Sequence, residues 1–392
     1  MLLNNVKLLH GTDPVNITVK EKYITGIRTA AGNSTEYFQL RFEHAIAFPG
    51  LINSHDHLDF NCFPALGDQH YNNYTEWGKH IHETYRQEID AVLQIPGNLR
   101  AIWGMYKNLL AGVTTVVNHG SFLLIEKPLI DILQNTQNLH SVKFEKAWKW
   151  KLNNPLLKKK DCVIHTGEGT DRQSAEEIDA LIQWNLLKRN LIGIHGVAMN
   201  AEQAKKFRAL VWCPESNRFL LNRDAGIKNL KDHTKLLLGT DSTLTGNWNI
   251  WHHLRLARKT GLVSDEELFD MLTKTAAEIW SSGNGQLLEN KYADIVIAKA
   301  NNTGWADFFK TDPEDILLVI KKGVIRLFDS GLLSQLQQLN FNTGSFSQVS
   351  MNNSKKFVEG DLTALSNTIK EYYPNAIFPF HTHQATKMTV DA

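Results

Sequence analysis

Three short polar strings that follow apolar, strand-like runs constrain the fold of this chain most strongly. They are SHDH at 54–57, HTGE at 165–168 and GTDS at 239–242. Each string stands at the carboxyl end of its run. Enzymes built as barrels of alternating strands and helices carry their chemistry at this end of the strands. The pattern therefore predicts that three distant segments meet at one face of a parallel barrel.

The same strings contain the side chains of a hydrolytic metal site. His55 and His57 are two residues apart, so both point to one side of an extended strand. His165 supplies a third imidazole, and Asp241 supplies a carboxylate oxygen. Mixed nitrogen and oxygen ligands suit Zn²⁺ or Fe²⁺ and disfavour a thiolate site. We expect a divalent metal cofactor, with Zn²⁺ preferred and Fe²⁺ as the alternative.

Glu168 lies three residues after His165, beyond the end of the strand-like run. From there it can reach a water on the ion without ligating the ion, which is where a general base belongs. Taken singly, His165 or His195 could be a hydrogen-bonded core histidine, and Asp241 could cap a helix. Their shared position at strand ends favours a site.

Seven segments occur in a familiar order: FPGLINSHDH, AGVTTVVNHG, HTGEG, GIHGVAMNAEQA, VWCPESNRFL, LLLGTDS and GQLLENKYADIVIAKA. In this order the chain, from about residue 48 to 298, resembles the amidohydrolase superfamily. The similarity is greatest to the branch of cytosine, guanine and adenosylhomocysteine deaminases and triazine hydrolases. The resemblance implies an α/β fold, a distorted (β/α)8 TIM barrel with a small β-sandwich domain built from both chain ends.

The domain boundaries follow from this resemblance and from the strand-like ends. Residues 1–47 and 286–330 are expected to form the β-sandwich, with ADIVIAKA and ILLVIKKGVIRLFD as its returning half. Residues 48–285 are expected to form the metal-dependent barrel. Residues 331–392 form a C-terminal extension in which LLSQLQQL and LTALSNTIKEYY look helical and NFNTGSFSQVSMNNSKK looks like a loop. His381 and His383 near its end lack a nearby third ligand, so a packed or solvated tail is favoured over a second metal site.

The predicted barrel has one strand too few. Only seven strand candidates can be read, and fifteen residues, 146–160, separate LHSVKFEKA from the HTGE strand. That interval is too short for a helix, a strand and another helix. Either WKWKL forms a cramped fourth strand or one strand–helix unit is reduced.

The resemblance also assigns roles to the site residues. An ion held by the four ligands would lower the pKa of its bound water from ~15.7 towards 7, so that hydroxide is available at neutral pH. Glu168 would carry the proton to the leaving nitrogen, His195 would steady the attacking water or the new oxygen, and Asp241 would ligate and help to move protons. No lysine stands where two-metal branches place their bridging carbamate, so a single ion is expected.

Substrate contacts are expected from Trp77, Ser216 and Asn217, although Ser216 and Asn217 could equally serve as structural caps. The leading function is hydrolytic deamination of a nitrogen heterocycle by metal-bound hydroxide. The first alternative is ring opening of a cyclic amide, as in imidazolonepropionase, because the same groups serve either leaving group. The second alternative is a degenerate metal-binding barrel without activity.

Composition agrees with a globular enzyme. The 392 residues include 42 basic and 41 acidic side chains, so no charge excess points to nucleic acid. No apolar run has the length of a membrane span or of a signal-peptide core. Three cysteines, an odd count, fit free thiols in a reducing, cytoplasmic setting. The expected partner is a small-molecule substrate, with neither nucleic acid nor membrane; self-association into a homo-oligomer is compatible with the sequence.

Overall fold

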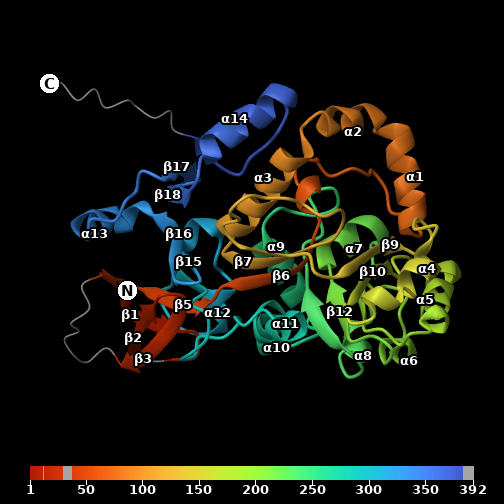
Figure 1. Cartoon of the computed structure of the whole chain (residues 1–392), viewed down its shortest axis with the longest axis horizontal. Helices are drawn as coiled ribbons and strands as arrows, with labels where there is room; N and C mark the ends of the chain where they lie inside the picture. Colours follow the sequence, from red (N-terminus) through yellow and green to blue (C-terminus); the bar gives the residue numbers. More distant parts are fainter. Residues whose placement is uncertain (12, 30–37, 383–392) are drawn as a thin grey trace.

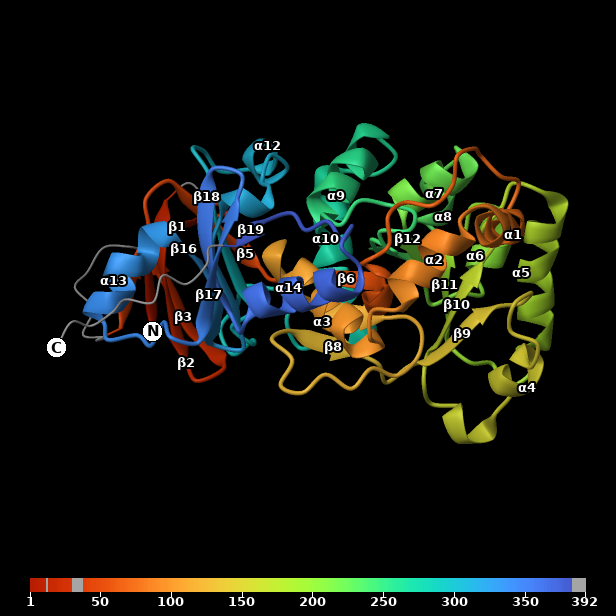
Figure 2. The ribbon, with the colours of Figure 1, turned by 90° about the horizontal axis from the view of Figure 1, so that it is seen from above.

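The computed structural model describes residues 1–11, 13–29 and 38–382. Its strands form three sheets. The largest sheet lies at one end of the molecule, and the parallel strands with most of the helices lie at the other (Figures 1 and 2). No helix in the described ranges is long and apolar enough to cross a membrane.

Two parallel sheets carry the site. One has the order β13-β12-β11-β10-β9 and the other β6-β7-β8. The strands are β6 (Leu51–Asp56), β7 (Val113–Asn118), β8 (Asp131–Leu133), β9 (Gln137–Ser141), β10 (Cys162–Thr166), β11 (Leu191–His195), β12 (Ala209–Trp212) and β13 (Lys235–Leu238). Most are buried throughout, as expected for parallel strands covered on both faces.

The carboxyl ends of the two sheets adjoin. The His55 carbonyl accepts hydrogen bonds from the backbone N–H groups of Thr240 at 3.0 Å and Asp241 at 3.1 Å. Asp56 and Asp241 form an isolated parallel bridge. The segment after β13 is thereby fixed against the end of β6, which brings residues almost two hundred positions apart to one point.

Helices follow most of the parallel strands, and several begin at a clear cap. Asn73 accepts hydrogen bonds from the N–H groups of residues 75 and 76. Asp171 caps the helix that begins at Arg172, and Ser264 forms a capping box with Glu267. The helices of this region are α1 (Tyr74–Thr84), α2 (Arg86–Leu93), α3 (Gly97–Leu110), α4 (Trp148–Leu152), α5 (Arg172–Trp184), α6 (Ala201–Ala204), α7 (Pro214–Leu221), α8 (Ile227–Leu230), α9 (Ile250–Lys259), α10 (Asp265–Leu272) and α11 (Lys274–Trp280).

The strand that the sequence count missed is β8. It has three half-buried residues, too few to show an alternating pattern, and it precedes LHSVKFEKA rather than following it. The WKWKL segment is helix α4, with Trp148 and Leu152 buried one turn apart, so its interpretation as a strand is wrong. The described segments 119–130 and 134–136, on either side of β8, contain no helix. The second and third units, which begin with β7 and β8, are therefore both reduced to a strand without a helix.

Strands from both chain ends form one sheet of eleven strands, ordered β19-β17-β18-β16-β15-β14-β5-β1-β2-β3, with β4 beside β1. Strand β5 pairs antiparallel with β14, with Ala47 opposite Ile297. The sheet comprises β1 (Leu2–Leu8), β2 (Pro14–Lys20), β3 (Tyr23–Thr29), β4 (Gln39–Arg41), β5 (Ala45–Pro49), β14 (Ile295–Lys299), β15 (Ile316–Lys321), β16 (Val324–Asp329), β17 (Phe346–Met351), β18 (Ser354–Glu359) and β19 (His381–Thr382).

The C-terminal extension continues this sheet. Its two helical patterns are confirmed as α13 (Leu333–Gln338) and α14 (Leu362–Tyr372). The prediction that the polar stretch is a loop is wrong, because this stretch forms most of the hairpin of β17 and β18. Its strand signal is masked by polar residues on the outer face, while Val349 and Val358 pack into the core. His381 lies in β19, and His383 lies outside the described residues.

Gly104 in α3 provides a test of how the helix positions the first ligands. A Cβ at this residue would lie 2.2 Å from the carbonyl oxygen of Leu58, directly after His57. We predict that Gly104→Ala destabilises the protein by about 1–3 kcal/mol, because backbone must move. Gly226→Ala is the matched control, since no heavy atom lies within 4 Å of the position that its methyl group would take. Equal urea denaturation midpoints for both variants would contradict this account.

Candidate metal centre and active site

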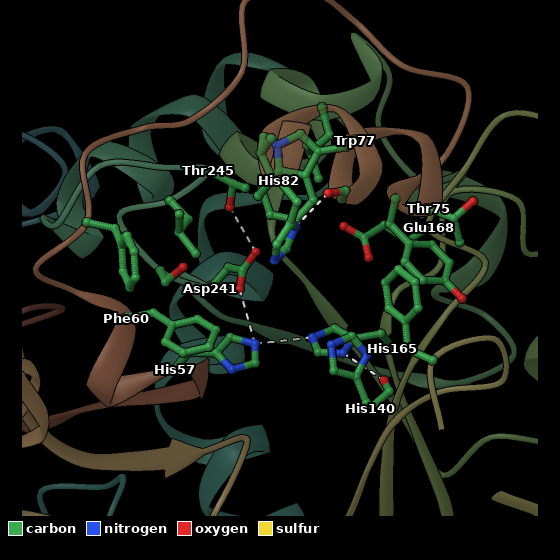
Figure 3. Close-up of a pocket in the computed structure, with 18 of the residues that line it drawn as sticks. His57, Phe60, Thr75, Trp77, His82, His140, His165, Glu168, Asp241 and Thr245 are labelled. Carbon is green, nitrogen blue, oxygen red and sulfur yellow. Dashed lines mark hydrogen bonds and ion pairs between the residues drawn. The ribbon is translucent and has the colours of Figure 1, made fainter. Parts of the chain in front are cut away.

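Four side chains converge at the carboxyl ends of β6, β10 and β13 (Figure 3). They are His55, His57, His165 and Asp241, and one ligand atom from each lies within 4.8 Å of the others. The alternation of β6 directs both histidines of the first string to the same side. The structure thus brings together the four residues that the sequence marked as metal ligands.

The three imidazoles face one another through their Nε2 atoms. His165 Nε2 lies 3.3 Å from His57 Nε2 and 3.3 Å from His55 Nε2. His165 Nδ1 donates to the carbonyl of His140 at 2.8 Å, so its Nε2 atom carries the lone pair. Burial lowers the pKa of both His57 and His165 below the usual histidine value, so the converging nitrogens cannot all be paired with one another. A cation between them would satisfy all three.

Asp241 completes the group from the opposite side. Its Oδ1 atom is 3.5 Å from the Nε2 atoms of both His55 and His57. Its Oδ2 atom accepts hydrogen bonds from Ser216 at 2.8 Å and Thr245 at 2.9 Å. Burial opposes ionisation, but the hydrogen bond with His55 and the neighbouring imidazoles of His57 and His195 hold the pKa of Asp241 well below its usual value. The carboxylate is therefore ionised and fixed in orientation.

Glu168 lies beside this group but is not one of its members. Its side chain is buried, and Oε1 is 3.5 Å from Nε2 of His195. Burial raises the pKa of Glu168 well above its usual value, and the charges of Asp241 and Glu177 add to the shift. A raised pKa makes the carboxylate a stronger base, so that it accepts a proton more readily than an ordinary glutamate does.

His195 ends β11 with a φ of 70°, in the left-handed region that non-glycine residues rarely adopt. Asp241 is similar, with a φ of 60°. His195 Nδ1 donates to Oδ1 of Asn217 at 2.9 Å, and burial lowers the pKa of His195 to about 4. The ring is therefore neutral, with Nε2 free to accept. Uncommon backbone conformations of this kind cluster at functional sites.

The three predicted substrate contacts have different surroundings. Trp77 lines the cavity above the metal-ligand group, and its indole N–H donates to the Leu66 carbonyl at 2.7 Å. Ser216 and Asn217 are fully buried and do not line that cavity. Ser216 donates a hydrogen bond to Asp241, and Asn217 accepts one from His195. These contacts favour a structural role for both residues over direct contact with the substrate.

Two histidines in this region were not singled out from the sequence. His119 follows β7, is 2% exposed and has no hydrogen-bond partner on either ring nitrogen among the described residues. Its ring centroid is 4.4 Å from that of His165. His140, in β9, lines the cavity. The signal used for the ligands, a histidine at the end of an apolar strand, could have found His119, whereas the strand of His140 reads QNLHS and carries no such signal.

A buried ion pair supports the site from below. Lys107 Nζ on α3 is 2.8 Å from Oδ2 of Asp56, and both side chains are almost fully buried. Asn108 and Asn53 donate to the same oxygen at 2.7 and 3.1 Å. Because Asp56 stands between the two histidines of the first string, this network fixes the end of β6. Removing one partner of such a pair lowers folding stability, because the other charge is left buried without a partner.

Comparisons with known proteins support the resemblance. A sequence model of the amidohydrolase family matches residues 157–326. A search of curated proteins gave no match. The resemblance to the amidohydrolase family is confirmed over this segment, which contains His165, Glu168, His195 and Asp241.

Solved structures show the same fold at low sequence identity. An adenosine deaminase from Xanthomonas campestris with bound zinc matches with a TM-score of 0.67 and 15% identity, covering 86% of this chain and 97% of that one. An atrazine chlorohydrolase from Arthrobacter aurescens, complexed with zinc, matches with a TM-score of 0.61 and 14% identity, covering 86% and 99%. A 5-methylcytosine deaminase from Klebsiella pneumoniae matches with a TM-score of 0.61 and 15% identity, covering 83% and 97%.

The buried imidazoles predict how the metal-free protein responds to acid. Burial lowers the pKa of His57 to about 3, and His55 adds to the shift. The unfolded chain binds this proton below about pH 6.5, whereas the folded chain does not until about pH 3. Folding stability should therefore fall with decreasing pH, by about 1.4 kcal/mol per pH unit for each such histidine.

Denaturation of the metal-free protein between pH 7 and pH 5 measures this slope. His57→Asn should reduce the slope, whereas the exposed His70→Asn should leave it unchanged. A stability that does not vary with pH over this interval would contradict the assignment of neutral, buried imidazoles.

Proposed function

We propose that the protein is a metal-dependent hydrolase that removes an amino or imino group from a nitrogen heterocycle. The observation that carries the proposal is the convergence of three imidazole nitrogens and one carboxylate oxygen beside a buried carboxyl group. The family match over residues 157–326 supports it. The solved structures with the same fold include two deaminases. Zinc is present in the adenosine deaminase and in the atrazine chlorohydrolase. The presence of every expected group argues against a degenerate, inactive barrel.

The donor set fits a divalent ion. Three neutral nitrogens and one hard oxygen are ligands that Zn²⁺ accepts readily, and Fe²⁺ is the alternative. All three cysteines are free but none belongs to the group, which agrees with a site without thiolates. When bound, the ion would supply Lewis-acid chemistry, lowering the pKa of water and polarising the substrate. His55, His57, His165 and Asp241 would hold it.

The chain's own groups would move the protons. Glu168 would accept a proton from the attacking water, since its raised pKa makes it a stronger base, and deliver it to the departing nitrogen. His195 would hydrogen-bond to the oxygen added to the ring carbon, because Asn217 fixes its orientation from behind. Asp241 would keep its charge throughout, since Ser216 and Thr245 hold its second oxygen.

We also propose that the two parallel sheets are halves of one distorted eight-stranded barrel spanning 48–285. The pairing of β5 with β14 supports a second unit made of 1–47 and 286–330, as a sandwich-like curl of the eleven-stranded sheet. The free thiols support a reducing compartment such as the cytoplasm.

Replacing the proton carrier should separate catalysis from metal binding. We predict that Glu168→Gln lowers kcat by about 10² to 10⁴-fold while metal content is unchanged, because the carboxyl group is not a ligand. Glu177→Gln is the matched control, a neighbouring buried carboxyl group outside the cavity, and should retain most activity. Loss of metal from Glu168→Gln, or full activity in it, would show that the role is misassigned.

Replacing a ligand should remove both properties. We predict that the purified protein carries one equivalent of divalent metal per chain and that Asp241→Asn or His165→Ala lowers this occupancy together with activity. Elemental analysis of the wild type and both variants measures the ratio. Two equivalents per chain in the wild type would contradict the single-ion site.

Ammonia measurement distinguishes the two hydrolytic reactions. Deamination releases one ammonia per turnover, whereas opening of a cyclic amide leaves the nitrogen in the product. A screen of amino-substituted purines, pyrimidines and pterins against hydantoin-like rings, with the metal-loaded protein, therefore tests the proposal. Turnover of hydantoin-like rings without ammonia would replace deamination by ring opening.

A further inference from the structure

The cavity above the metal-ligand group has a volume of about 560 Å³. Its floor consists of His57, His165, His195, Asp241 and Glu168, and helices α1 and α2 supply part of its wall (Figure 3). The sequence points to the chemistry of this floor but says little about the walls. The walls decide which heterocycle can reach the floor.

Apolar side chains dominate the walls. His57 stacks on Phe60 with ring centroids 5.3 Å apart and planes inclined by 14°, which leaves a flat slot beside a ligand. Higher up, the apolar lining comes from separate elements on every side: Phe63, Trp77, Ile89, Phe144, Leu220 and Leu244. A planar ring near the floor would thus be followed by a compartment whose lining is mostly apolar.

Several polar groups of the wall are already engaged within the protein. The Trp77 N–H donates to the Leu66 carbonyl, and the hydroxyl of Thr75 donates to Asn73 at 2.6 Å. The Thr245 hydroxyl donates to Asp241 at 2.9 Å. No asparagine, glutamine or arginine occurs among the lining residues in the described part of the chain. The remaining polar side chains of the wall are His82, whose Nδ1 donates to the Gly78 carbonyl at 2.7 Å, and His140, Tyr74 and Ser242. A ribose in the upper compartment would lose water from its hydroxyl groups and find few partners to replace it.

Charge excludes a second group of ligands. Among the described residues, Lys79 is the only lysine or arginine in the lining, its side chain is 76% exposed, and it lies 3.9 Å from Glu83. It therefore points to solvent rather than into the cavity. A phosphate or carboxylate on the substrate would be buried without a fixed cation and would face Glu168 and Asp241 on the floor.

The mouth of the cavity is apolar as well. Phe144 is 50% exposed and Leu93 is 48% exposed, and both line the cavity. An apolar substituent lying between them would remove this surface from water, at roughly 25 cal/mol per Å². A polar substituent would gain nothing there.

We infer that the cavity binds an uncharged, planar nitrogen heterocycle bearing an apolar substituent, with the ring beside Phe60 and the substituent between α1, α2 and Phe144. Nucleosides and phosphorylated or carboxylated rings should bind less tightly. This inference rests on the proposed function, because the floor groups orient the ring, but it concerns binding and can be measured without turnover.

A matched pair of probes tests it. 9-Benzyladenine and adenosine share the ring and the amino leaving group and differ only in an apolar or a polyol substituent. Isothermal titration calorimetry with zinc-loaded Glu168→Gln protein measures binding without hydrolysis. We expect 9-benzyladenine to bind at least tenfold more tightly. Equal affinities, tighter binding of adenosine, or binding of neither probe would overturn the inference.

Wall variants locate the substituent. Phe144→Ser should weaken 9-benzyladenine about tenfold or more and leave adenosine within a factor of two, and Leu93→Ser should act in the same direction if Phe144→Ser does not fold. Phe122→Ala is the control, because Phe122 is 76% exposed and outside the cavity. Loss of affinity in the control alone, or no change in either wall variant, would overturn the placement.

The two proposals can fail separately. Tight binding of 9-benzyladenine by the variant, with no ammonia released by wild-type protein from any amino-substituted ring, would refute deamination and leave the binding inference intact. Ammonia release from adenosine but not from 9-benzyladenine, with matching affinities, would support deamination and refute the apolar compartment.

Discussion

The structure depends on burying several hydrogen-bond acceptors together that cannot donate to one another. Three imidazole Nε2 atoms and one carboxylate oxygen meet in a largely buried site at the floor of the cavity. Burying such groups unpaired is costly, so the surrounding chain must hold them in place against their tendency to separate. The carbonyl of His140 fixes the far side of the His165 ring, and the hydroxyls of Ser216 and Thr245 fix the far side of the Asp241 carboxylate. A bound cation would interact favourably with all four acceptors and would thereby stabilise the folded protein.

The support extends beyond direct contacts. The Asp56–Lys107 pair anchors the end of β6 to α3, and Gly104 lets that helix approach the turn after His57. On the opposite strands, His195 and Asp241 occupy left-handed backbone conformations that the rest of the fold must stabilise. Placing the site at strand ends therefore uses stability supplied elsewhere, chiefly by the buried parallel strands and the eleven-stranded sheet.

Reaction and recognition are separated in space. The polar floor comes from the parallel strands, whose positions are set by backbone pairing, whereas the apolar wall comes largely from α1, α2 and loops. Loops and short helices can change without disturbing the strand ends. This separation agrees with a fold that is retained at 15% identity to a zinc-bound adenosine deaminase, because the strands that set the fold do not depend on the lining of the wall.

The sequence by itself determined the local chemistry. The two-residue spacing placed His55 and His57 on one face, and apolar runs marked seven of the eight parallel strands. The order of motifs indicated the resemblance to the amidohydrolase family, which the family model matches over residues 157–326. Tertiary structure decided what local pattern cannot encode. Strand β8 is three residues long and exists only because β7 pairs with it, and the β17–β18 hairpin forms because β16 offers an edge to a polar segment. Tertiary structure also decided the roles of Ser216 and Asn217, because their hydrogen-bond partners lie far away in the sequence. It likewise left His119 without a hydrogen-bond partner among the described residues.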